Sequence, residues 1–361
     1  MGKDRADFVE YLREGSGKVT KPLVSVIVPV YNAGKILSET LDSLCGQDYG
    51  VYEILCIDDG STDDSAAIVK SFEAKDQRVK YVPQANEGPG AARNHGIELA
   101  KGEYIVFQDA DDLLHPQALS ILVEAAERHQ ADVAICGFQS CREDLSDADM
   151  KLKLDGEPEV FTGDLALAFQ DSRKFRGHPW GKLYRRSVIG DVRFNDLRSG
   201  EDTYFNIDIA ARAKCMVVLG IPLYIYRQTA SSLTHQARHH QETIEAGKAI
   251  GFHCMELYRA GRISADAMIA LVRHYATNAI FLHVLLMSTN HKMDLCKRRE
   301  LLKQASLAFQ ELSKANPTIT NICSPKYRFV CFLSIKHQNL WIAMIIGELR
   351  SLGLRLRSIL H

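Results

Sequence analysis

The amino-acid sequence predicts an α/β fold, in which a mostly parallel sheet is flanked by helices and followed by a helical C-terminal region. Two observations lead to this prediction. Strand-like and helix-like stretches alternate between residues 24 and 138, which is typical of a parallel sheet with helices on both faces. From about residue 240 to the end of the chain, the apolar residues recur at helical spacing.

The predicted strands are short runs rich in Val, Ile, Tyr and Phe. They span residues 24–30, 53–57, 79–82, 103–107 and 131–138. Between them, apolar residues lie on one helix face, as do Leu37, Leu41 and Leu44. Ligands of open sheets bind outside the carboxyl ends of the strands, so we expect the side chains that follow these strands to share one crevice.

The strand at 103–107 leads directly into three carboxylates, Asp109, Asp111 and Asp112. Carboxylates at this spacing repel one another and are costly to desolvate, so we expect a role that requires them. A hard divalent cation binds oxygen ligands of this kind and completes its shell with phosphates and waters. The segment therefore indicates a divalent-cation site, with a solvated loop and helix cap as the alternative.

Other strand ends carry groups suited to a diphosphate-linked ligand. Tyr31 offers a flat face for a base, and Asp59 can accept a hydrogen bond from a base N–H or a ribose hydroxyl. The backbone N–H groups from Gly88 to Gly90, where a helix starts, form an anion site, and Arg93 adds a positive fork. Each has a structural alternative, because Asp59 can cap a helix, Tyr31 can pack in the core and Gly90 can permit a turn.

The second half of the chain is less regular. Residues 139–175 are polar and predict an insertion or a flexible loop over the site, whereas residues 215–219 are strand-like. Residues 279–287 are apolar almost all round, which predicts a buried helix. From Lys326 onward six basic residues accompany the single acid Glu348. Such a tail either lies on an anionic membrane surface or packs as an ordinary helix pair on the protein or on a second subunit.

Composition limits the classes of function. The 361 residues include 44 Lys and Arg against 45 Asp and Glu, which gives a net charge of −1. The chain therefore lacks the overall basic charge that would suggest binding to nucleic acid. Nine scattered cysteines, with no Cys-x-x-Cys pair, indicate reduced thiols in a cytoplasmic protein. No apolar run approaches the roughly 18 residues of a membrane span, so we expect a soluble protein with at most peripheral contact at the inner face of the plasma membrane.

Four motifs follow one another along the chain. They are Pro29-Val-Tyr31-Asn32, Asp58-Asp59-Gly-Ser-Thr-Asp63, Asn86-Glu-Gly-Pro-Gly-Ala-Ala-Arg93-Asn94 and Gln108-Asp109-Ala-Asp111-Asp112. With these motifs, the chain from residue 22 to 235 resembles the family 2 inverting glycosyltransferases that build bacterial surface polysaccharides.

The resemblance implies a GT-A fold and a domain map. The map has a lead-in (1–21), a glycosyltransferase domain (22–238) with a nucleotide-binding half (22–138) and an acceptor half (139–238), and a helical region (239–361). It also implies a nucleotide-sugar donor, usually a UDP-sugar, a saccharide or lipid-linked saccharide acceptor, and Mn²⁺ or Mg²⁺.

Residue roles follow from the same resemblance. Pro29 and Tyr31 would line the nucleoside pocket, Asp59 would pair with uracil, and Arg93 would reach the base or a phosphate. Asp109 would touch ribose or sugar. Asp111 would be the metal ligand.

The second half of the chain supplies a candidate base. An inverting transfer needs a carboxylate to take the proton of the attacking hydroxyl, and the resemblance assigns Asp202, next to Glu201, to that role. Its alternative is a helix-start acid stabilised by the helix dipole, worth about 0.5 kcal/mol. Trp180, Lys182 and Glu201 would contact the acceptor or the sugar, and His235 would complete the metal shell or touch the diphosphate. Core packing is the alternative for Trp180, and a structural role is the alternative for His235.

The sequence therefore predicts a metal-dependent glycosyltransferase of polysaccharide assembly. A sugar-nucleotide pyrophosphorylase is a rival, but it would carry a Gly-rich, Arg-containing loop after the first strand, where Tyr31-Asn-Ala-Gly34 stands. A second alternative is an inactive relative that binds carbohydrate or is the scaffold of a glycan-assembly complex. The donor sugar, the acceptor and the oligomeric state stay open.

Overall fold

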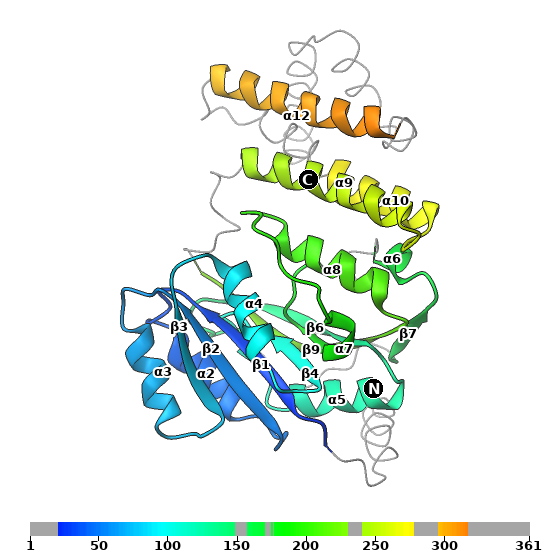
Figure 1. The fold of residues 1–361 in the computed structure, drawn as a ribbon. Coiled ribbons are helices and arrows are strands. Elements are labelled where there is room, and N and C mark those ends of the chain that lie inside the picture. Colours follow the sequence, from blue (N-terminus) through cyan, green and yellow to red (C-terminus); the bar gives the residue numbers. More distant parts are fainter. Residues whose placement is uncertain are drawn as a thin grey trace, which may run out of the picture. The chain divides into compact units, whose positions relative to one another are not determined.

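The structure, a computed structural model, describes residues 21–148, 157–169, 175, 177–229, 240–277 and 295–316 (Figure 1). The chain divides into two units. The first holds the chain up to Leu165 together with Arg173–Asp196 and Asp208–His235, and the second holds Ala166–Ser172, Leu197–Ile207 and the chain from Gln236.

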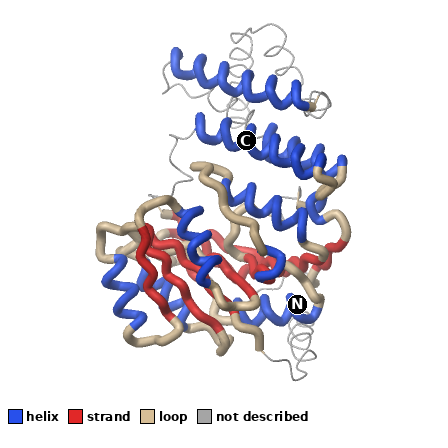
Figure 2. Tube along the Cα trace, in the orientation of Figure 1, coloured by secondary structure: helices blue, strands red, loops and turns tan. Residues whose placement is uncertain are grey.

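A nine-stranded sheet forms the first unit, with strand order β3-β2-β1-β4-β8-β6-β9-β5 and with β7 paired to β9 (Figures 1 and 2). The strands are β1 (Val24–Val30), β2 (Tyr52–Asp59), β3 (Val79–Gln84), β4 (Tyr104–Phe107), β5 (Leu113–Leu114), β6 (Val133–Arg142), β7 (Glu159–Thr162), β8 (Lys182–Arg185) and β9 (Cys215–Gln228). Strands β3, β2, β1 and β4 are parallel, as predicted. The sheet as a whole is mixed, because β8 runs antiparallel to β4 and β6, and β5 and β7 run antiparallel to β9.

Helices pack on both faces of the parallel strands (Figure 1). They are α2 (Leu37–Cys45), α3 (Ser65–Glu73), α4 (Pro89–Leu99) and α5 (Ala118–Arg128). The alternation of side chains along β1 explains the two layers. Val26 and Val28 share one core with Leu41 of α2 and Leu122 of α5. Ile27 points the other way, towards α4, where any side chain at Gly96 would collide with it.

Several local predictions need correction. Residues 139–175 are not irregular throughout, because β6 extends to Arg142, and β7 and the short helix α6 (Leu165–Ala168) follow. Residues 215–219 are the start of a longer strand, β9, which continues to Gln228. The short strand β5 directly follows the acidic segment and was not predicted. Its two residues pair with β9, a contact between distant parts of the chain that no local pattern signals.

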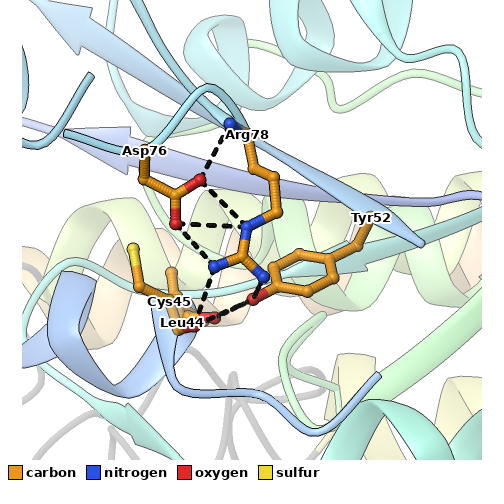
Figure 3. Close-up of polar contacts among 5 residues, drawn as sticks. All are labelled: Leu44, Cys45, Tyr52, Asp76 and Arg78. Atoms are coloured by element: carbon orange, nitrogen blue, oxygen red, sulfur yellow. Dashed lines mark hydrogen bonds and ion pairs between the residues drawn. The ribbon is translucent and has the colours of Figure 1, made fainter. Parts of the chain in front are cut away.

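The amino ends of β2 and β3 are joined to α2 by an arginine (Figure 3). Arg78 donates from Nε and Nη2 to the carboxylate of Asp76, from Nη1 to the hydroxyl of Tyr52, and from Nη2 to the carbonyl of Cys45 at 3.0 Å. The Tyr52 hydroxyl in turn donates to the carbonyl of Leu44 at 2.9 Å. These carbonyls end α2, where a positive charge is favourable.

The second unit is helical where it is described. Besides parts of α6 and of α8 (Glu201–Arg212), it contains α9 (His240–Arg259), α10 (Ala265–Leu271), a π-helical stretch (Val272–Thr277) and α12 (Leu295–Ala315). An ion pair between Lys248 and Glu311 links α9 to α12. Among the residues that the structure describes, no helix combines the length and hydropathy required to cross a bilayer. The predictions for residues 1–20, for the helix at 279–287 and for the basic tail from Lys326 lie outside the described residues.

Candidate active site

The parallel strands end together at one edge of the sheet. The register pairs Val30 of β1 with Asp58 of β2, and Asp59 of β2 with Gln84 of β3. On the other side of β1, the N–H of Gln108, just beyond β4, donates to the carbonyl of Ile27 at 3.0 Å. The residues that follow these strands therefore meet at what we call the carboxyl edge, as the alternation of strands and helices predicted.

Asp59 is buried at this edge and organises the loop before α4. Its Oδ1 accepts hydrogen bonds from Gln84 Nε2 at 2.8 Å and from the N–H of Glu87 at 2.9 Å, and its Oδ2 accepts one from the N–H of Gly88 at 2.8 Å. Gly88 has a φ of +94°, which favours glycine, and Pro89 begins the helix. The Gly88 N–H is thus directed at a carboxylate of the chain, and its contact with a donor phosphate stays a prediction.

Tyr31 follows β1 and is 53% exposed, so it does not pack in the core. Pro29 is half-buried two residues earlier. The turn after Tyr31 is tied to the loop after β2. The N–H of Ala33 donates to Ser65 Oγ at 2.9 Å, and that of Gly34 donates to Asp63 Oδ2 at 2.9 Å. These bonds fix the backbone that follows Tyr31 relative to the end of β2.

Arg93, on α4, crosses to the end of β4. Its Nη2 lies 3.1 Å from Asp109 Oδ1, and its guanidinium carbon lies 5.3 Å from the ring centre of Phe194. Arg93 is 5% exposed, whereas the Asp109 side chain is 27% exposed and reaches the surface. One buried cation therefore neutralises part of the charge of the acidic segment.

The three carboxylates after β4 have unequal environments. Burial, with the charge of Asp109, raises the pKa of Asp111 from 3.8 to about 6. Asp112 is fully buried, and burial together with the charges of Asp109 and Asp111 raises its pKa to about 8. Asp112 Oδ2 accepts a hydrogen bond from the hydroxyl of Tyr224 at 2.6 Å, and Oδ1 accepts one from the N–H of Arg227 at 2.7 Å. Asp112 therefore binds to β9.

The donor set fits a hard divalent cation only in part. Asp109 and Asp111 offer carboxylate oxygens in a segment with excess negative charge, which a cation would relieve. Both Asp112 oxygens already accept hydrogen bonds from β9. Among the described residues, no group of three or more His, Cys, Asp and Glu could hold a metal ion by itself. His235 lies outside the described residues. Oxygen atoms of a bound substrate would therefore have to complete the coordination shell of the cation.

Trp180 and Lys182 lie in the interior of the first unit. Trp180 is 8% exposed and stacks on Tyr224, with ring centres 4.3 Å apart and planes at 11°, and also on His178. Lys182 is 1% exposed, and its Nζ donates to the carbonyl of His178. These contacts support the packing alternative for Trp180, and the sugar contacts of both residues stay predictions.

Glu201 and Asp202 form the first turn of α8 (Glu201–Arg212), and both belong to the second unit. The start of this helix packs on α9. A side chain at Gly200 would meet Ala246 at 3.2 Å, and the rings of Tyr204 and His253 stack with centres 3.8 Å apart. Asp202 thus lies on a packed helix start, and its role as the base stays a prediction.

Known proteins share both the sequence pattern and the fold. The model of the family described as Glycosyl transferase family 2 matches residues 25–193. The uncharacterized glycosyltransferase EpsJ of Bacillus subtilis (strain 168) is 36% identical over 223 residues, which are 59% of this chain and 63% of EpsJ. Glycosyltransferase GlyG of Streptococcus pneumoniae serotype 4 is 33% identical over 221 residues, which are 58% of this chain and 72% of GlyG. The chain belongs to glycosyltransferase family 2.

The fold of the chain is also that of a solved structure. The crystal structure of residues 1–349 of S. aureus TarS in complex with UDP-GlcNAc has a TM-score of 0.74 and 22% identity, and the match covers 91% of this chain and 92% of that chain. The predicted GT-A fold with a helical C-terminal part is thereby confirmed. The matched part of the chain spans less than two thirds of EpsJ.

The sequence analysis did not identify two residues that contact the acidic segment. Both Tyr224 and Arg227 contact Asp112, from which they are separated by 112 and 115 positions in the sequence. Arg227 is 2% exposed, and its Nη2 lies 2.6 Å from Glu39 Oε2. One signal in the sequence could have indicated them. Arg227 directly follows an aromatic, strand-like run, and an arginine that a strand buries needs a partner for its charge.

Proposed function

We propose that this glycosyltransferase moves a sugar, with inversion, from a UDP-sugar to a hydroxyl of a saccharide or lipid-linked saccharide in the assembly of a surface polysaccharide. The observation that carries the proposal is the ion pair of Arg93 with Asp109 at the carboxyl edge. Asp59 binds the loop before α4 at this same edge, and Tyr31 follows β1 there with an exposed side chain. Further support comes from TarS, which has this fold and was crystallised with UDP-GlcNAc.

The donor would lie along the carboxyl edge. The Tyr31 ring supplies a face for the base, and Asp59 keeps acceptor capacity for a base N–H, since each carboxylate oxygen has two lone pairs. Arg93, already paired with Asp109, adds positive charge where the diphosphate would lie. Asp109 and Asp111 would hold Mn²⁺ or Mg²⁺, an ion that offsets negative charge on a departing diphosphate.

Asp202 would act on the acceptor. The acceptor oxygen forms the new bond to the anomeric carbon, the bond from that carbon to the diphosphate oxygen breaks, and the carboxylate of Asp202 takes the hydroxyl proton. Attack from the side opposite the diphosphate inverts the configuration. A positioned base of this kind contributes about 10²–10⁴ in rate.

Donor binding is tested by thermal shift with a panel of nucleotide-sugars, with and without Mn²⁺. A UDP-sugar at 100 times its dissociation constant should stabilise the fold by about 2.7 kcal/mol. Stabilisation by UDP-sugars that requires Mn²⁺ is expected. Equal shifts with every nucleotide, or none, would contradict the proposed donor.

The base is tested by Asp202→Asn, with Asp266→Asn as the matched control, because Asp266 is an exposed acid in the first turn of α10. Turnover should fall about 10²–10⁴-fold in Asp202→Asn with donor affinity unchanged. Asp266→Asn should keep both the turnover and the donor affinity of the wild-type protein. Equal losses of binding and turnover would count against the assignment, and a wild-type protein that binds donor without turnover would support the inactive relative.

A further inference from the structure

The hydroxyl of Tyr224 lies between the two ends of the acidic segment Asp109–Asp112. It accepts a hydrogen bond from the N–H of Asp109 at 3.4 Å and donates one to Asp112 Oδ2 at 2.6 Å. The segment is also closed on itself, since the N–H of Asp112 donates to the carbonyl of Asp109 at 3.3 Å. The hydroxyl of Tyr224 therefore contacts both ends of the turn that carries Asp109 and Asp111, the two carboxylates proposed to hold the cation.

Strand β9 fixes this phenol relative to the turn. Leu114, two residues after Asp112, pairs with Tyr224 in the antiparallel β5–β9 ladder. The N–H of His115 donates to the carbonyl of Leu223 at 2.8 Å, and the N–H of Arg227 donates to Asp112 Oδ1 at 2.7 Å. The turn is thus attached to β9 by backbone bonds on one side and by Asp112 on the other.

The ring of Tyr224 has little freedom to move. It is fully buried and stacks on Trp180 with ring centres 4.3 Å apart. Trp180 stacks in turn on His178, and the rings of Phe138 and Trp180 lie at 82° to each other with centres 5.2 Å apart. A hydroxyl on a fixed ring defines a fixed point, and groups bonded to it are held at that point.

We propose that Tyr224 is a positioning residue, which holds the Asp109–Asp112 turn so that the carboxylates of Asp109 and Asp111 are presented together to a divalent cation. This proposal rests on the proposed function. Without the hydroxyl, the Asp109 N–H loses its side-chain acceptor and the buried Asp112 oxygen loses its donor. Fewer hydrogen bonds then hold the turn in one conformation.

The test is Tyr224→Phe, which removes the hydroxyl and keeps the ring that stacks on Trp180. The matched control is Tyr52→Phe, which removes a buried hydroxyl where the parallel strands of the same sheet begin, at what we call the amino edge. There the hydroxyl bonds to Arg78 and Leu44 (Figure 3). Each variant is titrated with Mn²⁺ in the presence of UDP, by calorimetry and by thermal shift, so that the readout does not depend on turnover.

The dissociation constant for Mn²⁺ should rise about 10–100-fold in Tyr224→Phe, the range for loss of a group that orients a metal ligand, and should be unchanged in Tyr52→Phe. An unchanged constant in Tyr224→Phe, or an equal rise in both variants, overturns the positioning role. If Tyr224→Phe does not fold, Trp180→Leu removes the ring on which Tyr224 stacks, and the constant should rise in the same direction. No rise there also overturns the role.

The wild-type titration separates this proposal from the one on which it rests. If the wild-type protein binds UDP with Mn²⁺ and only the effect of Tyr224→Phe is missing, the positioning role falls and the proposed function stands. If the wild-type protein binds no UDP in the presence of Mn²⁺, both fall.

Discussion

The two edges of the parallel strands hold charged side chains in opposite ways. At the amino edge, all three guanidinium nitrogens of Arg78 donate to acceptors, and the carboxylate of Asp76 receives bonds from the same arginine (Figure 3). At the carboxyl edge, Asp109, Asp111 and Asp112 follow one another within four positions, and Arg93 pairs with Asp109.

The pKa values show what the difference means. The hydrogen bonds from Arg78 lower the pKa of Asp76 from 3.8 to about 2, so the fold stabilises its charge. Burial raises the pKa of Asp111 to about 6, so the fold destabilises its charge. The amino edge is therefore built for stability. The carboxyl edge keeps unbalanced charge that a bound cation would relieve.

Among the tests of these two edges, the largest effect is expected from Asp111→Asn, which tests the carboxyl edge. Turnover should fall about 10²–10³-fold, the range for loss of one electrostatic stabiliser of the transition state. The free energy of unfolding should not fall, because removing one of three clustered charges reduces their repulsion. Asp42→Asn, at an exposed acid of α2, is the control for turnover and for urea unfolding. If Asp111→Asn were destabilised and kept normal turnover, Asp111 would serve stability and not function, which would contradict the comparison.

Arg78→Ala tests the amino edge, and the next largest effect is expected there. The free energy of unfolding in urea should fall by about 2–3 kcal/mol, because Tyr52 and the end of α2 lose a charged donor. Arg78→Lys should lose less, since lysine keeps the charge but not the planar fork. Donor affinity and turnover of the folded protein should be unchanged, and a loss of either would show that the two edges are coupled.

The smallest effect is expected in the pH dependence of stability, measured with Asp76→Asn. The folded pKa of Asp76 lies below its unfolded value, so its stabilising contribution is present above about pH 4 and is lost as the pH falls towards 2. The wild-type protein should lose more stability over this range than Asp76→Asn does. Parallel curves for the two proteins would mean that the Arg78 pair does not stabilise the charge.

Long-range contacts explain what the sequence analysis left undecided. The acidic motif does not distinguish Asp112 from Asp109 and Asp111. The partners of Asp112, Tyr224 and Arg227, lie more than a hundred residues away in the sequence. Trp180 was expected to face either a sugar or the core, and its stack on Tyr224 depends on the pairing of distant strands.

The sequence by itself determined the parallel strands, the helices between them and the polar residues at the strand ends, as in Tyr31, Asp59 and Asp109. Periodicity and turn chemistry are local properties, and one register rule places all the carboxyl ends of parallel strands at one edge. Only the tertiary structure decided that Asp112 binds to β9, that Lys182 is buried and that Gly88 donates to Asp59. Each of these depends on which distant groups fill the space around a side chain, and no local pattern records that.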